Sequence, residues 1–199
     1  MKKYLLTLIF LLISSAIFAN EKGDMFLAPK AGIGFSIPPE IYLNANSDWA
    51  TVLNIGIAFD YFFIDKFAFT TELLYEYQPM HYNYTFFNAT HIFNFNYITI
   101  PMGVRYYWKY VLAGTGLYYG IKLKNKEALR EEGTTNTIGS LDDKNDIGIF
   151  FDFGLNLKLF ETNNLSIYAR YKYGFLELIE EYPLRTNTLT FNIAYGFKF

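Results

Sequence analysis

Apolar side chains recur at every second position through most of this sequence, and that period constrains the fold more than any other feature. The last stretch, TLTFNIAYGFKF at residues 188–199, is the clearest case. Its apolar members are Leu189, Phe191, Ile193, Tyr195, Phe197 and Phe199. Successive side chains of a β-strand point to opposite faces, whereas a helix repeats every 3.6 residues. The stretch therefore predicts a strand with one strongly apolar face.

The same alternation predicts eight strands in all. They cover residues 27–37, 52–61, 67–78, 93–107, 111–123, 146–157, 165–175 and 188–199. The connections between them alternate between long polar segments and short ones. The long ones are 38–51, 79–92, 124–145 and 176–187, and the short ones are 62–66, 108–110 and 158–164. This is the pattern of up-and-down antiparallel hairpins.

The fourth strand breaks the pattern in two places. Phe93 and Phe95 lie in the opposite phase from Ile98, so we expect a bulge near Asn96–Tyr97. Pro101 lies in mid-strand, where it removes a ladder hydrogen bond, so we expect a local irregularity there as well.

Residues 1–19 have the layout of a secretory signal peptide: two lysines, an apolar run and small residues before the predicted cut. Residues 20–199 show no linker and predict one domain. No later stretch of about 18 apolar residues predicts a membrane-spanning helix. The sequence has no cysteine, which excludes disulfides, thiol chemistry and a lipidated cysteine anchor.

Aromatic residues make up 21% of the chain and charged residues only 18%, against about 25% charged in an average soluble domain. The formal net charge of −2 leaves no basic field to attract nucleic acid, so we exclude that class of partner. An exported chain this apolar still has to place its apolar surface somewhere.

Two barrels fit eight such strands, and they differ in which face points inward. A soluble barrel would have to fit Phe, Tyr, Leu and Ile from every strand inside a narrow tube. The opposite face carries mostly Gly, Ala, Ser, Thr and Asn, which suit a crowded lumen better. We therefore predict an all-β, eight-stranded, antiparallel up-and-down transmembrane β-barrel with its apolar face toward lipid.

The charged residues of the opposite face then line the lumen. They are Lys30, Asp60, Glu72, Glu76, Arg105, Lys122, Asp146, Asp152, Arg170, Lys172 and Lys198. Six are basic and five acidic, so they can pair across the tube. At eight strands side chains just fill the interior, which predicts a plug rather than an open channel.

Four segments together resemble the outer-membrane β-barrel domain family, which includes OmpX-like, OmpA-like and PorT-like barrels of Gram-negative bacteria. They are YITIPMGVRYYW (97–108), GTGLYYGIKL (114–123), DIGIFFDFGLNL (146–157) and IYARYKYGF (167–175). The resemblance implies location in the outer membrane, contact with its lipid and assembly by the barrel insertion machinery. It also implies a C-terminal assembly signal at Tyr195, Phe197 and Phe199.

Three local patterns could indicate chemical sites. His81 and His91 could form a metal site or supply a general base, but without cysteines or nearby acids they are better explained as loop residues. The glycines of GTG at 114–116 alternate within a strand and are explained by a crowded lumen. DDKNDIG at 142–148 fails the EF-hand pattern, which leaves only weak calcium binding by residues 142–146 open. We therefore predict no metal and no cofactor.

The favoured function is a monomeric, non-catalytic scaffold that contacts an extracellular protein or surface through loop 124–145. One alternative is a narrow ion or solute pore along the charged lumen. A second is a lipid-modifying enzyme, with His81 or His91 paired with Glu76 and with Ser47 or Ser140 nearby. A fold of this kind hosts many functions, so the sequence alone leaves the three open.

Overall fold

The computed structural model describes residues 21–37, 45–84, 89–123, 126–131, 134–140, 144–159, 162–179 and 184–199. The predicted signal peptide, residues 1–19, lies outside these ranges. No helix of the described residues is long and apolar enough to cross a membrane.

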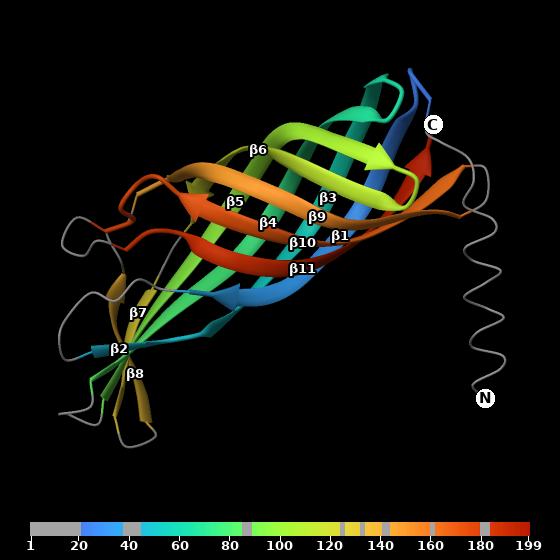
Figure 1. The fold of residues 1–199 in the computed structure, drawn as a ribbon. Helices are drawn as coiled ribbons and strands as arrows, with labels where there is room; N and C mark the ends of the chain where they lie inside the picture. Colours follow the sequence, from blue (N-terminus) through green and yellow to red (C-terminus); the bar gives the residue numbers. More distant parts are fainter. Residues whose placement is uncertain are drawn as a thin grey trace, which may run out of the picture.

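Eight long antiparallel strands close into a barrel (Figure 1). They are β1 (Met25–Ser36), β3 (Ala50–Ile64), β4 (Phe67–Tyr84), β5 (Ala89–Trp108), β6 (Val111–Lys122), β9 (Asp146–Leu159), β10 (Asn163–Gly174) and β11 (Asn187–Lys198). Each pairs with its neighbour, β1 pairs with β11, and the β4–β5 ladder completes the ring. Closure leaves no free edge around the tube. The eight-stranded barrel predicted from the sequence is confirmed.

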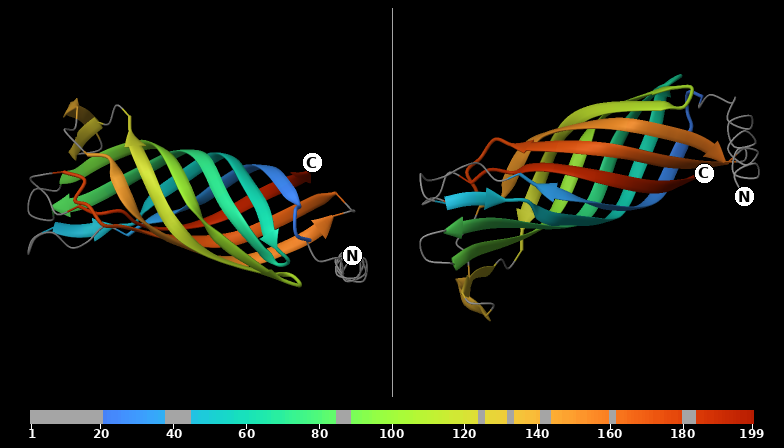
Figure 2. Two further views of the ribbon diagram at one scale, coloured as in Figure 1. Left: turned by 90° about the horizontal axis from the view of Figure 1, so that it is seen from above. Right: turned by 60° about the horizontal axis from the view of Figure 1, so that its bottom comes forward.

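The strands run obliquely around the barrel, and its two ends differ (Figure 2). At the turn end lie the pairing of Phe26 with Lys198 and two hairpins closed by only two residues, 65–66 and 109–110. Lys66 and Lys109 have positive φ angles of 69° and 53°, as tight hairpin turns require. The longer connections leave from the opposite end, which we call the loop end.

The outer wall carries the apolar phase of every long strand. Ile55 and Phe153 are more than 60% exposed. Exposed aromatics occur toward the ends of the strands, at Phe35, Tyr61, Phe67, Tyr106, Trp108, Tyr173, Phe175 and Phe197, and also at mid-strand, at Phe151 and Phe191. The wall is therefore apolar over its whole height and rich in aromatics, as a lipid-facing surface is.

Three further strands stand beyond the ring, on the loop end (Figures 1 and 2). At the loop end β4 and β5 continue past their barrel neighbours, and β2 (Ala45–Asp48) pairs with β4 while β7 (Lys126–Glu131) pairs with β5. The strand β8 (Thr134–Ser140) pairs with β7. We call this five-stranded extension, in the order β2-β4-β5-β7-β8, the projecting sheet. These segments were predicted as loops, and the prediction was wrong for 45–48 within 38–51, for most of 79–92 and for much of 124–145.

The bulge predicted near Asn96–Tyr97 is absent, since β5 keeps one register against both β4 and β6. Phe93, Phe95 and Tyr97 are simply inward-facing and buried. The register instead shifts between Phe62 and Ile64, next to a two-residue turn. Pro101 does interrupt pairing, because the β4–β5 ladder skips from Met102 to Thr99. The irregularity predicted at Pro101 is confirmed, although the register is the same on both sides of it.

Two glycines on β5 and β6 set how closely these strands approach. Gly103 pairs with Gly116, and an added Cβ on Gly103 would lie 2.2 Å from the Thr115 carbonyl oxygen of the neighbouring strand. A methyl group there would force the backbone of the neighbouring strand to move.

We expect Gly103→Ala to lower the free energy of unfolding by about 2 kcal/mol, measured by urea titration in lipid vesicles. Gly139→Ala is the matched control, because an added Cβ at Gly139 meets nothing within 4 Å. Equal stability of the two variants would contradict the close approach.

Candidate functional site

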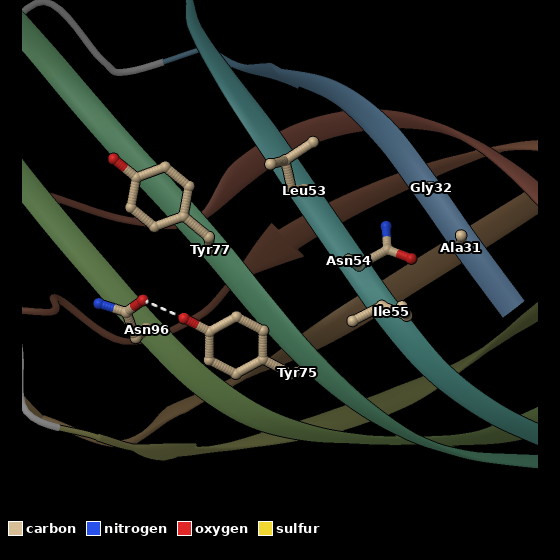
Figure 3. Close-up of a pocket in the computed structure, with 8 residues that line it drawn as sticks. All are labelled: Ala31, Gly32, Leu53, Asn54, Ile55, Tyr75, Tyr77 and Asn96. Atoms are coloured by element: carbon tan, nitrogen blue, oxygen red, sulfur yellow. Dashed lines mark hydrogen bonds between the residues drawn. The ribbon is translucent and has the colours of Figure 1, made fainter.

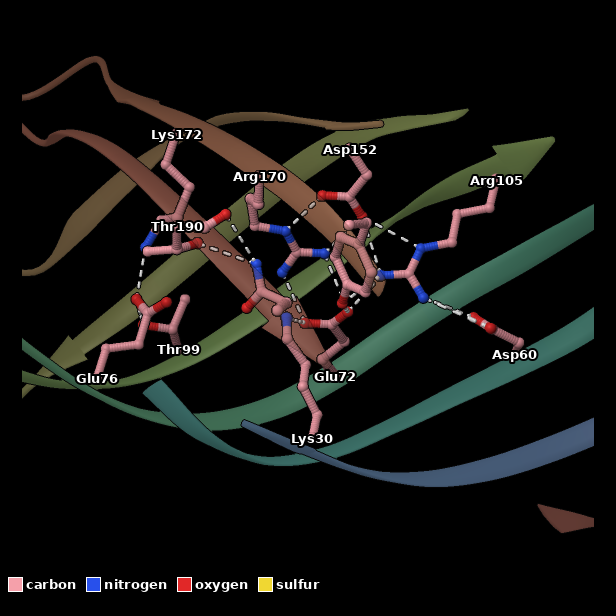
Figure 4. Close-up of polar contacts among 12 residues, drawn as sticks. Lys30, Asp60, Glu72, Glu76, Thr99, Arg105, Asp152, Arg170, Lys172 and Thr190 are labelled. Atoms are coloured by element: carbon pink, nitrogen blue, oxygen red, sulfur yellow. Dashed lines mark hydrogen bonds and ion pairs between the residues drawn. The ribbon is translucent and has the colours of Figure 1, made fainter. Parts of the chain in front are cut away.

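The middle of the lumen is filled by charged side chains, whose polar contacts are shown in Figure 4. We call Lys30, Asp60, Glu72, Arg105, Asp152 and Arg170 the central charge cluster. It joins β1, β3, β4, β5, β9 and β10 across the tube. The side chains of Lys30, Glu72, Arg105, Asp152 and Arg170 are each at most 2% exposed.

Glu72 and Asp152 are bridged by two arginines. Arg170 donates from Nη1 to Glu72 Oε2 and from Nε to Asp152 Oδ1, each at 2.6 Å. Arg105 donates from Nη2 to Glu72 Oε1 at 2.6 Å and to Asp152 Oδ2 at 2.9 Å. Paired donors to a carboxylate are the strongest hydrogen-bond geometry available to a guanidinium. The four side chains thus form one connected unit across the tube.

Two more charged groups complete the central charge cluster, and an aromatic ring lies against it. Lys30 donates to Glu72 Oε2 at 2.7 Å, and Asp60 accepts from Arg105 Nη1 at 3.3 Å. Tyr168, which is buried, lies beneath the Arg105 guanidinium at 4.9 Å from its ring centroid. Three cations therefore face three carboxylates, and the cluster carries no net charge in its ionised form.

A second polar group lies nearer the loop end. Lys172 donates to Glu76 Oε2 at 2.5 Å, and Thr99 donates to the same oxygen at 2.7 Å. Asp146 accepts from Tyr118 Oη at 2.9 Å and from Thr186 Oγ1 at 2.6 Å. This group continues the polar filling of the tube from the central charge cluster toward the loop end.

Apolar side chains close both ends of the lumen. At the turn end Phe26, Phe62, Ala68, Tyr107, Leu112 and Tyr168 belong to one buried cluster. At the loop end Met80, Tyr82, Phe93, Phe95, Tyr97, Leu178, Ile179 and Leu184 form another. The second cluster includes residues of the 176–187 connection, where the Leu178 amide donates to the Leu184 carbonyl at 2.7 Å. The charged middle layer is thus enclosed between two apolar layers.

The structure places the predicted lumenal charges unevenly. Nine of the eleven lie in the two polar groups just described. Lys122 is exposed at the loop end. Lys198 lies at the turn end, where its Nζ is 2.7 Å from Asp24 Oδ1. Sequence reasoning missed the inward aromatics and the apolar layers, although Phe62, Tyr107 and Tyr168 share the strand phase of the charges and could have been found by that signal.

The ion pair between Lys198 and Asp24 lies outside the membrane-facing belt. Burial disfavours the carboxylate of Asp24, but the hydrogen bonds from Lys198 and from the Glu21 backbone, together with the charges of Lys198 and Lys158, outweigh burial and lower the pKa of Asp24 overall. The stability that this carboxylate contributes is therefore present above its usual titration range and is lost as the pH falls below it.

The C-terminal residues lie on the outer wall near the turn end. Phe197 and Phe199 are 50% and 70% exposed, and the Phe199 ring lies 6.3 Å from that of Phe59. Tyr195 accepts a hydrogen bond from Asn163 Nδ2 at 2.9 Å and contacts the Phe197 ring.

The two histidines do not form a common site. They lie on β4 and β5 rather than in a loop, and the register pairs His81 with Ile92 and His91 with Tyr82. They therefore lie on opposite faces of the projecting sheet and cannot ligate one metal ion. Glu76 is committed to Lys172 in the lumen. Among the described residues no group of three or more His, Asp or Glu could hold a metal ion. Residues 142 and 143 of the predicted calcium segment lie outside the described residues.

Removing one guanidinium from the central charge cluster leaves two carboxylates buried with too few donors. We expect Arg170→Gln to lower the free energy of unfolding by about 3–5 kcal/mol in lipid vesicles. Arg185→Gln is the control, because the Arg185–Glu177 ion pair is more than 40% exposed on both sides, and it should leave stability unchanged. If both variants unfolded at the same urea concentration, the central charge cluster would not be a stabilising unit.

No curated protein matches the sequence. Among solved structures, OprG from Pseudomonas aeruginosa has a TM-score of 0.50 at 15% identity, covering 90% of this chain and 98% of that one. AlkL, solved in lipid bilayers, has 0.49 at 14%, covering 90% and 91%. Ail of Yersinia pestis, solved with the heparin analogue sucrose octasulfate, has 0.46 at 13%, covering 89% and 99%.

The family model described as "Outer membrane protein beta-barrel domain" matches residues 25–180, which is most of the chain. In barrels of this kind the short turns face the periplasm and the longer loops face the outside. The projecting sheet therefore stands on the extracellular side, and the apolar outer wall contacts lipid. The chain belongs to the outer membrane protein β-barrel domain family, and its location is the outer membrane of a Gram-negative-type bacterium.

Proposed function

We propose that this protein is a scaffold with a closed lumen, which holds the projecting sheet outside the cell for contact with a protein partner. The observation that carries the proposal is the projecting sheet itself. The barrel needs no strand beyond its ring of eight, yet β4 and β5 continue past it and gather β2, β7 and β8. A sheet built beyond the membrane belt serves an external contact better than it serves the barrel.

The filled lumen supports a scaffold over a pore. Ion flow needs a continuous path of water, and the central charge cluster crosses the tube with side chains that are almost wholly buried. An apolar layer lies on each side of it. A pore of this width would need both apolar layers and the ion pairs to open together.

The strand β8 is the part of the projecting sheet best placed for a partner. It is the last strand in the sheet order, and its Thr135, Asn136 and Thr137 are exposed. The free side of an edge strand offers unpaired backbone donors and acceptors, which an extended segment of another protein can use. We therefore propose that β8, a strand within the predicted contact segment 124–145, makes the contact with the partner.

The test uses the full chain in living cells. A photoreactive amino acid at Thr135 or Asn136 should form a crosslinked adduct with a protein partner, while the same group at Lys109, exposed at the turn end, should not give that adduct. Replacing Lys126–Ser140 by a short Gly-Ser linker should abolish the adduct and leave the barrel folded, as judged by its gel mobility before and after boiling.

Two outcomes would overturn the scaffold. One is an absence of any adduct from β8 in cells that display the folded barrel. The other is a discrete conductance in planar bilayers that changes with Glu72→Gln, since Glu72 lies at the centre of the closed lumen. That result would favour the pore.

We also propose that Tyr195, Phe197 and Phe199 act as the signal that the barrel insertion machinery reads, and that the folded protein is a monomer. The exposure of Phe199 supports this, because a side chain with little packing contributes little to the finished fold. Deleting Phe199 should slow assembly in cells several-fold and leave the urea midpoint of refolded protein nearly unchanged. A large loss of stability with normal assembly would assign Phe199 to packing instead.

A further inference from the structure

The outer wall of the barrel carries a hollow of about 660 Å³ on the side formed by β1, β3, β4 and β5 (Figure 3). It is lined by Ala31, Gly32, Leu53, Asn54, Ile55, Tyr75, Tyr77 and Asn96. The volume lies within the range of sites for small ligands, about 300–1,000 Å³. A convex, evenly covered barrel wall would have no such feature.

Missing side-chain bulk on β1 creates the hollow. Ala31 is the outward residue of β1 between Pro29 and Ile33, and it pairs with Ile55, so a small floor lies beside the large walls of Leu53, Ile55 and Tyr75. The neighbouring Gly32 belongs to the lumenal phase, where an added Cβ would lie 2.3 Å from Asn192 Oδ1 and 2.6 Å from Asn54 Nδ2, so it contributes only backbone to the hollow. The small outward side chain of Ala31 is therefore what leaves the space open.

The hollow lies within the lipid-facing belt. Ile55 is 61% exposed, and Leu53 and Tyr75 are each more than 40% exposed. On the adjoining part of β1, Ile33 is exposed as well. Because this wall contacts lipid, the material that fills the hollow is an acyl chain rather than water.

The loop-end margin of the hollow is polar. Tyr75 Oη donates to Asn96 Oδ1, and Tyr77 Oη donates to Asn94 Oδ1, both at 2.7 Å. Asn94 pairs in register with Lys126 of β7, whose side chain is exposed. A cation thus stands beside the margin where the head group of a lipid in the hollow would lie.

We propose that the hollow is a specific site for one anionic, phosphate-bearing membrane lipid of the outer leaflet. Its acyl chain occupies the space over Ala31, and its negatively charged head group lies toward Lys126. The walls are strands of a closed sheet, so the site exists before the lipid arrives and costs little ordering on binding. This site is independent of the contact proposed for β8.

The test fills the hollow from its floor. The full chain is refolded into vesicles of equal parts dipalmitoyl phosphatidylglycerol and dipalmitoyl phosphatidylcholine, released into mild detergent and weighed by native mass spectrometry. The unmodified protein should retain one phosphatidylglycerol, and Ala31→Trp should retain at least tenfold less. Ala169→Trp is the matched control and should behave as the unmodified protein, because Ala169 also lies in the outward phase of its strand but between Phe153 and Phe191.

Gel mobility before and after boiling shows which variants are folded. If Ala31→Trp does not fold, Ile55→Trp fills the hollow from β3, and Ile167→Trp is its control on the exposed wall of β10. Lys126→Gln should keep the bound lipid and lose the preference for phosphatidylglycerol over phosphatidylcholine. An unchanged preference would overturn the assignment of the anionic head group to Lys126.

Equal lipid retention by folded Ala31→Trp and Ala169→Trp would overturn the site. A dimer that disappears with Ala31→Trp would also overturn it, since a second copy of the chain would then occupy the hollow.

Discussion

Every other feature of this barrel depends on how it keeps charges inside a tube that lipid surrounds. Isolated charges in such a place would cost several kcal/mol each, so they must be paired and hydrogen-bonded. The two arginines meet this condition with Glu72 and Asp152, because each guanidinium reaches both carboxylates. A lysine in place of either arginine would have one point of contact where the guanidinium has a fork. The side chains that solve this problem also fill the tube, so its closure and its charge balance have the same cause.

The apolar layers above and below strengthen this arrangement. They keep water away from the ion pairs, and the attraction between paired charges becomes stronger as the surrounding dielectric constant falls. Phe150 adds a face beneath the Arg170 guanidinium at 4.3 Å, and Tyr118 does the same for the Lys172 ammonium at 4.1 Å. The lumen thus has its ion pairs at the centre and apolar side chains at both ends.

The alternation that predicted the eight strands could not by itself say where the membrane ends. Along β5 the outward side chains are apolar at Ile98 and Ile100, but they are Asn94 and Asn96 beyond the belt, while the inward Phe93, Phe95 and Tyr97 are aromatic. The period of two is continuous, and only the surroundings change from lipid to water. A change in side-chain polarity was interpreted as a change of phase, which is why a bulge was expected where none exists.

The strands of the ring were predictable because one face of each meets lipid over many residues, which enforces a strong and regular pattern. The strands β2, β7 and β8 lie beyond the lipid-facing wall, so their sequences, such as TTNTIGS for β8, resemble ordinary loops. Their pairing depends on the long β4–β5 hairpin that supports them. The sequence also could not predict that Leu178, Ile179 and Leu184 close the loop end, because three apolar residues in a connection give no periodic signal.

The same reasoning bears on where this protein can act. A lumen held by interlocked ion pairs has little freedom to move, since any rearrangement must separate charges that have no water to receive them. The ring of strands is closed, and two of its hairpins at the turn end are closed by only two residues. The surfaces left to vary are the projecting sheet and the lipid-facing wall. A partner that leaves the core intact has to bind one of these two, and they differ in the solvent they face. The projecting sheet suits a protein from outside the cell, and the wall suits a lipid.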